Sequence, residues 1–332
     1  MTTDAQTAAG IDIPRGFVDA RIVGREQLAD EVVLFDLEIP GAPQAAPVSG
    51  SHLEIFLPVG EGEVRHYSVC ATSDSRFQIA VLKEKDGRGG SAWLHERATV
   101  GTVVPVRGPR NTFAFNPAGP ALFIAGGIGI TPILPMIDEA RAAGIEWSLL
   151  YLGAGRSRMA FADNLTRATG NITLWSSDTM GRVDLGMIIR DTAPTTTIYA
   201  CGPERMLREL SDLTAASGHA LVIEDFTIGH VDTAELAVAP ESADDHAFTV
   251  ELADGTEVPV PRGCSILTAL SGAGIRTLSS CQRGECGTCE TPIIAGEADH
   301  RDSVLSQEER DANEVMMICI SRAKGDRLVL DI

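Results

Sequence analysis

The sequence is poor in basic residues, in disulfide-type cysteine patterns and in long apolar runs. It contains 27 Lys and Arg against 46 Asp and Glu, a formal net charge of −19. Nucleic acids and anionic membranes bind basic surfaces, so we expect neither as a partner. We find no signal peptide and no apolar run long enough to span a membrane, and the seven cysteines do not form a disulfide framework. We therefore expect a cytoplasmic protein, which we take to be a monomer.

The sequence also lacks internal repeats and the histidine motifs of metal sites or hydrolases. We interpret the seven histidines, among them His52, His66 and His95, as surface or packing residues. A general acid and base triad is not expected. At 332 residues, with 44% hydrophobic residues, the chain is long enough for two or three domains with a core each.

Four cysteines near the C-terminus carry the most specific pattern in the sequence. Three follow a C-x4-C-x2-C spacing and the fourth stands 30 residues further on, as in the ligand set of a plant-type 2Fe-2S cluster. Zinc is the alternative, but zinc ligands usually form two separate short pairs. The remaining three cysteines are scattered. The predicted cluster ligands are Cys281, Cys286, Cys289 and Cys319.

Composition divides the chain into four regions. Residues 13–117 alternate short apolar stretches with Gly, Pro and Ser turns, which predicts an antiparallel β-barrel. Residues 118–228 alternate apolar strands with helical segments, which predicts an α/β domain with a parallel sheet. Residues 229–246 are rich in Ala, Asp, Glu, Pro and Ser and indicate a linker. Residues 247–332 begin with a hairpin and a short helix and contain the cysteine loop.

A glycine-rich segment, Gly126-Gly127-Ile128-Gly129-Ile130-Thr131-Pro132, lies between a predicted strand at 121–125 and a predicted helix at 132–143. Glycines let the backbone approach a pyrophosphate, and a helix N-terminus offers free N–H groups to it. Cys201-Gly202-Pro203 follows a later strand at the same expected sheet edge. The alternatives are an ordinary strand-to-helix turn and a buried small cysteine.

The barrel region contains Arg65-His66-Tyr67-Ser68 and, about 20 residues later, a turn with Gly89-Gly90-Ser91. An arginine can pair with a phosphate, a tyrosine can pack on a flat ring, and the turn can present amides and a hydroxyl to the phosphate. Taken alone, the first motif is better explained as a strand with alternating faces.

Together and in this order, the motifs resemble the flavin reductases of the ferredoxin-NADP reductase superfamily, and within it the phthalate dioxygenase reductase and vanillate demethylase reductase type. The resemblance covers residues 17–332 and includes Glu224-x-Phe226 and the ending Leu328-Val-Leu-Asp-Ile332. The order of flavin, nicotinamide and ferredoxin domains is characteristic of that type. It implies a flavin-binding barrel, an α/β domain that binds the nicotinamide nucleotide, and a C-terminal β-grasp ferredoxin domain.

The resemblance also implies residue roles. Arg65 and the Gly90-Ser91 turn would hold the flavin phosphate, and Tyr67 would pack on the isoalloxazine. Ser68, Cys201 and Phe226 would lie at the site of hydride transfer: Ser68 near flavin N5, Cys201 near nicotinamide C4, and Phe226 over the flavin face. The implied cofactor-binding residues are Arg65, Tyr67, Ser68, Lys83, Gly90, Ser91, Gly126, Gly127, Gly129, Thr131, Asp178, Cys201, Gly202 and Pro203.

The cofactors are expected to be FMN, a 2Fe-2S cluster and NADH. The compact turn and the resembling reductases favour FMN over FAD, which the superfamily also uses. Asp178, after a predicted strand near 173–175, would accept hydrogen bonds from the adenosine ribose and repel a 2'-phosphate, unless Arg156 or Arg182 pointed into the site.

A nicotinamide donates two electrons as hydride and a 2Fe-2S cluster accepts one, so a flavin between them fits the chemistry. The resembling family feeds Rieske non-haem iron oxygenases that dihydroxylate or O-demethylate aromatic compounds. The alternatives are a reductase for another acceptor, such as a cytochrome P450, and a passive electron carrier. Residues 244–332 contain 16 Asp and Glu against 8 Lys and Arg, which suits either docking on a basic partner or simple solubility.

Overall fold

The structure is a computed structural model that describes residues 13–332 except 15, 42–48, 61, 74 and 227–244. The chain forms two compact units, Met1–Thr227 and Ile228–Ile332, and each is described by itself. The predicted linker, residues 229–246, lies almost entirely outside the described residues. Among the described residues no helix is both long enough and apolar enough to cross a membrane.

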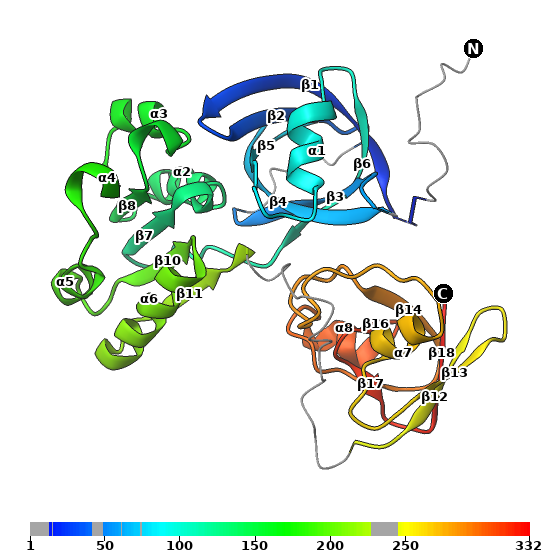
Figure 1. The fold of residues 1–332 in the computed structure, drawn as a ribbon. Helices are drawn as coiled ribbons and strands as arrows, with labels where there is room; N and C mark the ends of the chain where they lie inside the picture. The colour runs from blue at the N-terminus through cyan, green and yellow to red at the C-terminus, as the bar shows by residue number, and fades with distance from the viewer. Residues whose placement is uncertain (1–12, 15, 42–48, 61, 74, 227–244) are drawn as a thin grey trace. The chain divides into compact units, whose positions relative to one another are not determined.

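The first part of unit 1 is a closed antiparallel barrel (Figure 1). Its strands follow the order β1-β2-β5-β4-β3-β6 around the barrel. Alternate residues of each strand point inward, so that Phe35, Ile55 and Ile79 are fully buried in one core. The strands are β1 Val18–Ala29, β2 Val32–Glu38, β3 Ser51–Leu57, β4 Glu63–Ser73, β5 Arg76–Leu82 and β6 Val103–Asn111.

One helix accompanies the barrel, α1 Gly90–Arg97, where the sequence predicts a turn. The chain enters it through Gly89, whose φ of 89° is left-handed, and Leu94 of the helix is buried in the barrel core. Because glycine weakens helices, helix propensity does not predict a helix that begins at a Gly-Gly pair. The predicted Gly-Gly-Ser turn is therefore the entry and first turn of a helix.

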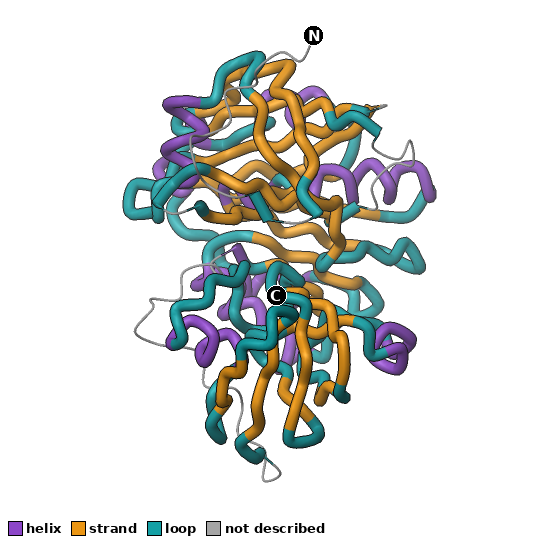
Figure 2. The backbone as a smooth tube through the Cα atoms, turned by 90° about the vertical axis from the view of Figure 1, so that its right-hand side faces the viewer, coloured by secondary structure: helices purple, strands orange, loops and turns teal. Residues whose placement is uncertain are grey.

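The second part of unit 1 is a parallel sheet in the order β11-β10-β7-β8-β9 with helices on both faces (Figures 1 and 2). In β7, Phe123 belongs to the core on one side and Ile124 to the core on the other. Both faces are buried, which is why the strand reads as a continuous apolar run. The strands are β7 Ala121–Gly126, β8 Trp147–Gly153, β9 Asn171–Ser176, β10 Thr197–Cys201 and β11 Leu221–Glu224.

Helices α2 and α3 contribute to the first of these cores, and α5 and α6 to the second. The helices are α2 Ile133–Ala143, α3 Ala162–Arg167, α4 Ser177–Met180, α5 Leu185–Asp191 and α6 Glu204–Ser217, with short 3-10 helices η1 Gly127–Ile130 and η2 Arg156–Arg158.

The barrel and the parallel sheet are packed together within unit 1. An apolar cluster joins Cys70 and Ala80 of the barrel to Ala160 and Phe161 of the α/β part. Beside it the Ser157 hydroxyl donates to the Asp30 carboxylate at 2.5 Å. Loops at the sheet edge are therefore held against the barrel.

Unit 2 is a mixed sheet covered by helices. β12 pairs in parallel with β18 and antiparallel with β13, and the order β13-β12-β18-β14-β16 is that of a β-grasp. Ser265 caps α7, whose Ile266 and Leu270 pack into the core. The elements are β12 Phe248–Leu252, β13 Glu257–Val260, α7 Ile266–Gly272, β14 Glu290–Ala295, β15 Ala298–Asp299, α8 Gln307–Ala312, β16 Val315–Met317, β17 Arg322–Ala323 and β18 Arg327–Leu330. The fold class predicted from the sequence is confirmed.

Candidate functional site

The loops that follow the parallel strands meet at one edge of the sheet because parallel strands all end there. A Cβ on Gly126 would lie 2.6 Å from Pro203 Cδ, and one on Gly129 would lie 2.2 Å from the Cys201 carbonyl oxygen. Gly126, the last residue of β7, and Gly129 are thus required by packing against the Cys201-Gly202-Pro203 turn. They bring both predicted nucleotide loops together.

Gly127 differs from these glycines. Its φ is +56°, and a Cβ there would meet nothing within 4 Å. The peptide at the start of η1 is therefore open to a ligand, as a pyrophosphate site needs. Thr131 is buried, and its hydroxyl donates to the Ile128 carbonyl at 2.9 Å, so its contribution is to shape this loop.

Side chains from both parts of unit 1 converge beside Cys201. Cys201 of β10 is fully buried and lies opposite Glu224 in the β10–β11 ladder. Ser68 of β4 approaches the Glu224 carboxyl from the barrel. Ser68 Oγ and Glu224 Oε2 are both buried, and neither makes a hydrogen bond of normal geometry. Buried polar atoms normally have partners, so these two atoms mark a place for a polar ligand.

Burial raises the pKa of Glu224 to about 8, and the Ser68 hydroxyl only partly opposes this shift. Burial also raises the pKa of the Cys201 thiol well above its usual value, and the Glu224 and Asp225 carboxyls raise it further. Both shifts favour the uncharged form of the group. Phe226, two residues after Glu224, is 39% exposed, as a residue that covers a ligand face can be.

A second cluster lies at the N-terminus of α1. A Cβ on Gly90 would lie 2.9 Å from Arg65 Cγ, so glycine lets the arginine side chain pass directly beside the helix start. Arg65 Nη1 donates to Glu63 at 2.7 Å, whereas Arg65 Nη2 is buried without a hydrogen-bond partner. The Ser91 hydroxyl accepts from the Glu84 amide at 3.1 Å. A guanidinium group beside the free N–H groups of a helix N-terminus is suited to bind a phosphate.

Arg88 belongs to the same cluster, although the sequence interpretation did not single it out. Its guanidinium is 3.6 Å from Glu63, and burial followed by repulsion from Arg65 lowers its pKa. Two guanidinium groups on one carboxylate leave positive charge for an anion. The only signal in the sequence was its place in Asp86-Gly87-Arg88-Gly89-Gly90-Ser91. Glu224 likewise entered the sequence analysis only as part of the Glu224-x-Phe226 motif, without an assigned role.

The other predicted flavin residues are placed differently from one another. Tyr67 is half-buried against the barrel core, and burial raises the pKa of its hydroxyl. Lys83 Nζ pairs with Glu96 of α1 at 2.8 Å, on a partly exposed surface. Lys83 is therefore turned to the outer side of α1, and its predicted cofactor contact stays a prediction.

Asp178 lies on α4 after β9, where its Oδ1 accepts from the Ser176 hydroxyl at 2.5 Å and its Oδ2 faces Gly155 of the neighbouring loop. Arg156 Nη2 pairs with Asp163 at 2.8 Å, and Arg182 pairs with Glu209 of α6. Both arginines thus contact carboxylates other than Asp178.

The histidines named in the sequence analysis have structural contacts. His52 and His66 stack with ring centroids 4.8 Å apart, next to the buried Glu54 carboxylate that pairs with Arg107. His95 contacts the Val81 carbonyl oxygen at 2.9 Å.

The four predicted cluster ligands of unit 2 fall into two pairs. The thiols of Cys281 and Cys286 interact with each other, and so do those of Cys289 and Cys319. Three of the four residues are buried, and Cys286 is the most exposed. Among the described residues no three His, Cys, Asp or Glu surround a single metal position. Two cysteine pairs suit two irons with two thiolates each better than one zinc ion.

The backbone around these thiols also fits a cluster. The Arg283 amide points to Cys281 Sγ at 3.4 Å, and the Cys281 amide points to Cys286 Sγ at 3.5 Å. Hydrogen bonds from the Cys286 thiol and from the backbone lower the pKa of Cys281 to about 5. N–H groups aimed at sulfur stabilise thiolates and tune a cluster.

Comparisons with known proteins agree with this arrangement. Residues 250–324 match the 2Fe-2S iron-sulfur cluster binding domain. The chain is 39% identical over 310 residues to phenoxybenzoate dioxygenase subunit beta of Ectopseudomonas oleovorans, covering 92% of this chain and 94% of the relative. It is 35% identical over 328 residues to phthalate dioxygenase reductase of Burkholderia cepacia, covering 96% and 98%.

Two solved structures are similar over nearly the whole chain. An intact type IV self-sufficient cytochrome P450 monooxygenase has a TM-score of 0.76 and 37% identity, with 98% of this chain and 43% of that chain covered. The structure of phthalate dioxygenase reductase, described as modular for electron transfer from pyridine nucleotides to 2Fe-2S, has a TM-score of 0.63 and 34% identity, with 96% and 98% covered. The predicted resemblance is confirmed, and the chain belongs to the phthalate dioxygenase reductase family of oxidoreductases.

Proposed function

We propose that this oxidoreductase takes electrons from NADH and passes them through FMN and a 2Fe-2S cluster to a Rieske non-haem iron oxygenase. The observation that carries the proposal is the meeting of Ser68, Cys201 and Glu224 at the edge where both nucleotide loops end. The paired cysteines of unit 2 supply the one-electron end of the path.

The chain's own residues have distinct tasks in this scheme. A flavin supplies the exchange between a two-electron donor and a one-electron acceptor. Arg65, Arg88 and the first turn of α1 hold its phosphate, and Ser68 orients its ring by a hydrogen bond. Gly127 exposes backbone to the nucleotide pyrophosphate. Uncharged Glu224 holds a proton beside Cys201 and leaves the pocket without a buried charge.

We assign the regions as the sequence suggested: residues 13–117 to the flavin, 118–228 to the nicotinamide nucleotide, 229–246 to a linker and 247–332 to the cluster. The barrel strands, the parallel sheet and the β-grasp lie inside these ranges. Limited proteolysis should cut first in the linker range and release a fragment that keeps iron.

The acceptor is inferred from relatives. Phthalate dioxygenase reductase and phenoxybenzoate dioxygenase subunit beta are components of dioxygenase systems by name, which supports an oxygenase as acceptor for this chain. The Rieske type and the organic substrate come from the family resemblance. A cytochrome P450 is the second candidate, because a self-sufficient P450 contains a part similar to 98% of this chain. Reduction of purified acceptors of both kinds decides between them.

FMN is preferred over FAD because the Arg65, Arg88 and α1 cluster offers a compact site for one terminal phosphate. Heat release of the flavin followed by chromatography tests this assignment. A peak of FAD alone would overturn it.

NADH is preferred over NADPH because Asp178 presents a carboxylate after β9 while Arg156 and Arg182 pair elsewhere. The ratio of kcat/KM for the two nucleotides with a dye acceptor measures the preference. An Asp178→Asn variant should narrow the ratio, and a wild-type enzyme that uses NADPH equally well would contradict the assignment.

The central test is an absorbance spectrum of the purified protein under argon, before and after NADH. Flavin and cluster bands should both bleach in the wild-type protein. In Cys286→Ser the cluster bands and the iron should be lost while flavin reduction by NADH remains. A protein with cluster bands alone that NADH does not bleach would be a passive carrier instead.

A further inference from the structure

The four cysteines lie on two segments of unit 2, the loop of residues 281–289 and the turn after β16 that contains Cys319. The β14–β16 ladder joins these segments at one side, where Glu290 pairs with Met317. A third segment, residues 299–306, touches both of them elsewhere. It contains no cysteine, and neither the sequence motifs nor the family assignment gives it a role.

This third segment supports the cysteine loop at Gly284, midway between Cys281 and Cys286. The Ser303 amide donates to the Gly284 carbonyl at 2.9 Å. Gly284 has φ of +74°, and a Cβ there would lie 2.9 Å from Asp302 Cα and 2.6 Å from Ile320 Cγ2. The loop backbone is thus in direct contact with Asp302 on one side and with the residue after Cys319 on the other.

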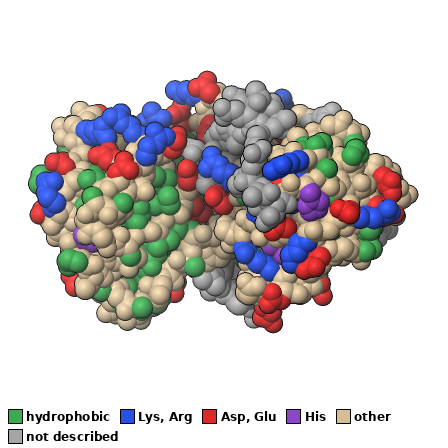
Figure 3. Space-filling model, turned by 90° about the horizontal axis from the view of Figure 1, so that it is seen from below, with side chains coloured by type: hydrophobic (Ala, Val, Ile, Leu, Met, Phe, Trp, Pro, Cys, Tyr) green, Lys and Arg blue, Asp and Glu red, His purple; other side chains and the backbone are tan. Residues whose placement is uncertain are grey.

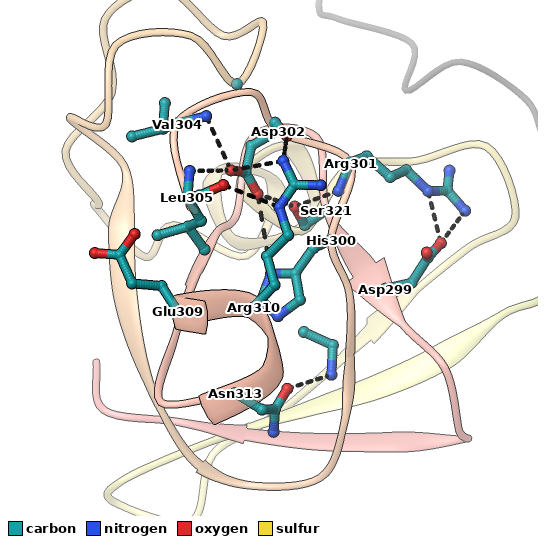
Figure 4. Close-up of polar contacts among 12 residues, drawn as sticks. Asp299, His300, Arg301, Asp302, Val304, Leu305, Glu309, Arg310, Asn313 and Ser321 are labelled. Carbon is teal, nitrogen blue, oxygen red and sulfur yellow. Dashed lines mark hydrogen bonds and ion pairs between the residues drawn. The ribbon is translucent and has the colours of Figure 1, made fainter. Parts of the chain in front are cut away.

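The Asp302 carboxylate holds the supporting segment in shape (Figure 4). The residue is only 4% exposed, and its Oδ2 accepts from the amides of Val304 and Leu305 at 3.2 and 2.9 Å. Arg310 of α8 adds donations to the carbonyl oxygens of Asp302 and, at 3.1 Å, Leu305. The turn is therefore fixed by hydrogen bonds to the Asp302 carboxylate and by Arg310 donations to the backbone of Asp302 and Leu305.

The same carboxylate reaches the segment of the fourth cysteine. The Ser321 hydroxyl, two residues after Cys319, donates to Asp302 Oδ1 at 3.3 Å and accepts from the Arg301 amide at 3.1 Å (Figure 4). Ser321 is fully buried, and its own amide donates to the Met317 carbonyl at 3.0 Å. Asp302 thus connects two segments. Through Ser303 and Gly284 it reaches the loop that contains three of the cysteines, and through Ser321 it reaches the turn that contains the fourth.

We propose that Asp302 is a positioning residue for the iron-sulfur cluster, acting through Ser303 on Gly284 and through Ser321 on Cys319. It sets how the Cys319 thiolate stands relative to the other three. Loss of a residue that hydrogen-bonds to a metal ligand and orients it typically lowers metal affinity 10-fold to 100-fold. Their hydrogen bonds and ligand angles also affect the electronic properties of the cluster. The proposal rests on the cluster assignment made above.

The test uses the full-length protein with its cofactors. Asp302→Ala removes all three acceptor contacts, and Ser321→Ala removes only the link toward Cys319. Asp302→Asn is the conservative variant, because its amide oxygen can still accept from the two backbone amides and its NH2 can donate to Ser321 Oγ. Glu297→Gln is the matched control, since Glu297 is an exposed carboxylate of the same unit, paired with Lys324 at 2.5 Å.

We measure iron transfer to a chelator and the electron paramagnetic resonance spectrum of the reduced protein. Asp302→Ala should lose iron about tenfold more readily than the wild type and show shifted g-values. Ser321→Ala should change in the same direction by less, and Asp302→Asn and Glu297→Gln should resemble the wild type. Flavin reduction by NADH reports that unit 1 is intact in every variant.

Wild-type iron retention and an unchanged spectrum in both Asp302→Ala and Ser321→Ala would overturn the proposal, even if their melting temperatures fell. If Asp302→Ala does not fold, Ser321→Ala decides by the same two readouts. A wild-type protein without two irons would instead overturn the cluster assignment, and with it this proposal.

Discussion

At the scale of the residue, three buried polar atoms without a hydrogen-bond partner lie among the candidate flavin and nucleotide residues. They are Arg65 Nη2 and Ser68 Oγ on β4 and Glu224 Oε2 at the end of β11. Desolvating such atoms costs free energy unless a ligand supplies the missing hydrogen bonds. The flavin and nicotinamide assignments account for all three.

Glu224 should make stability depend on pH. Its folded pKa of about 8 lies above the usual 4.5, so between these values the folded protein binds more protons than the unfolded chain. Stability should therefore fall as pH rises through this window, by at most about 1.4 kcal/mol per pH unit from this group. Glu224→Gln should remove that part of the slope. Urea unfolding of both proteins from pH 5 to pH 8.5 measures it, and equal slopes would contradict the buried, protonated carboxyl.

Arg88 should contribute to flavin binding although it stands outside the Arg-x-Tyr-Ser motif. A hydrogen bond to a charged group is worth about 1.5–3 kcal/mol, so Arg88→Ala should weaken FMN binding roughly tenfold or more. Arg76→Ala, at an exposed position at the start of β5, is the control with the same change in charge. Fluorescence titration of the flavin-free proteins gives both dissociation constants. Equal values for the two variants would remove Arg88 from the site.

At the scale of the element, the glycines at the end of β7 and in η1 show that one motif serves two purposes. Gly126 and Gly129 are needed so that two loops can pack backbone to backbone, whereas Gly127 leaves backbone open to a ligand. The segment therefore combines close packing between two loops with one open backbone position. Gly126 and Gly129 determine how the two loops pack, and the peptide at Gly127 remains open to a bound ligand.

Gly129→Ala should disturb both loops at once. Its Cβ would lie 2.2 Å from the Cys201 carbonyl oxygen, and backbone rather than a flexible side chain would have to move. Overpacking of this kind costs about 1–3 kcal/mol of unfolding free energy. Gly119→Ala, with no atom within 4 Å, is the control. Urea unfolding and the KM for NADH should change in Gly129→Ala alone, and an unaltered KM would separate this packing from nucleotide binding.

At the scale of the whole molecule, the net charge of −19 does not produce a face of one sign in the view of Figure 3, where acidic and basic side chains lie side by side. In unit 2 several arginines form ion pairs, such as Arg301 with Asp245 at 2.5 Å. The excess of acidic residues remains, and it can steer docking to a basic acceptor.

Electron delivery to the acceptor should therefore slow as salt is added. Screening already limits the reach of charges to about 8 Å at physiological ionic strength, and transient redox contacts bury little area. Flavin reduction by NADH, which we assign to unit 1, should stay nearly constant. Stopped-flow measurement of both half-reactions across a salt series separates them. An interprotein rate that stays flat or rises would show that docking is not electrostatic.

The sequence alone determined the fold class and proposed the four cysteine ligands, because apolar periodicity and fixed local spacings reflect chemistry between near neighbours in the chain. The C-x4-C-x2-C loop and the alternation of strands and helices are such local signals. The tertiary structure decided which residues meet across long separations: Arg88 with Arg65, Glu224 with Ser68, and Asp302 with both cysteine segments. It also turned Lys83 toward Glu96 and Arg182 toward Glu209. Such contacts depend on strand order and on which side chains are buried together, and no local pattern encodes either.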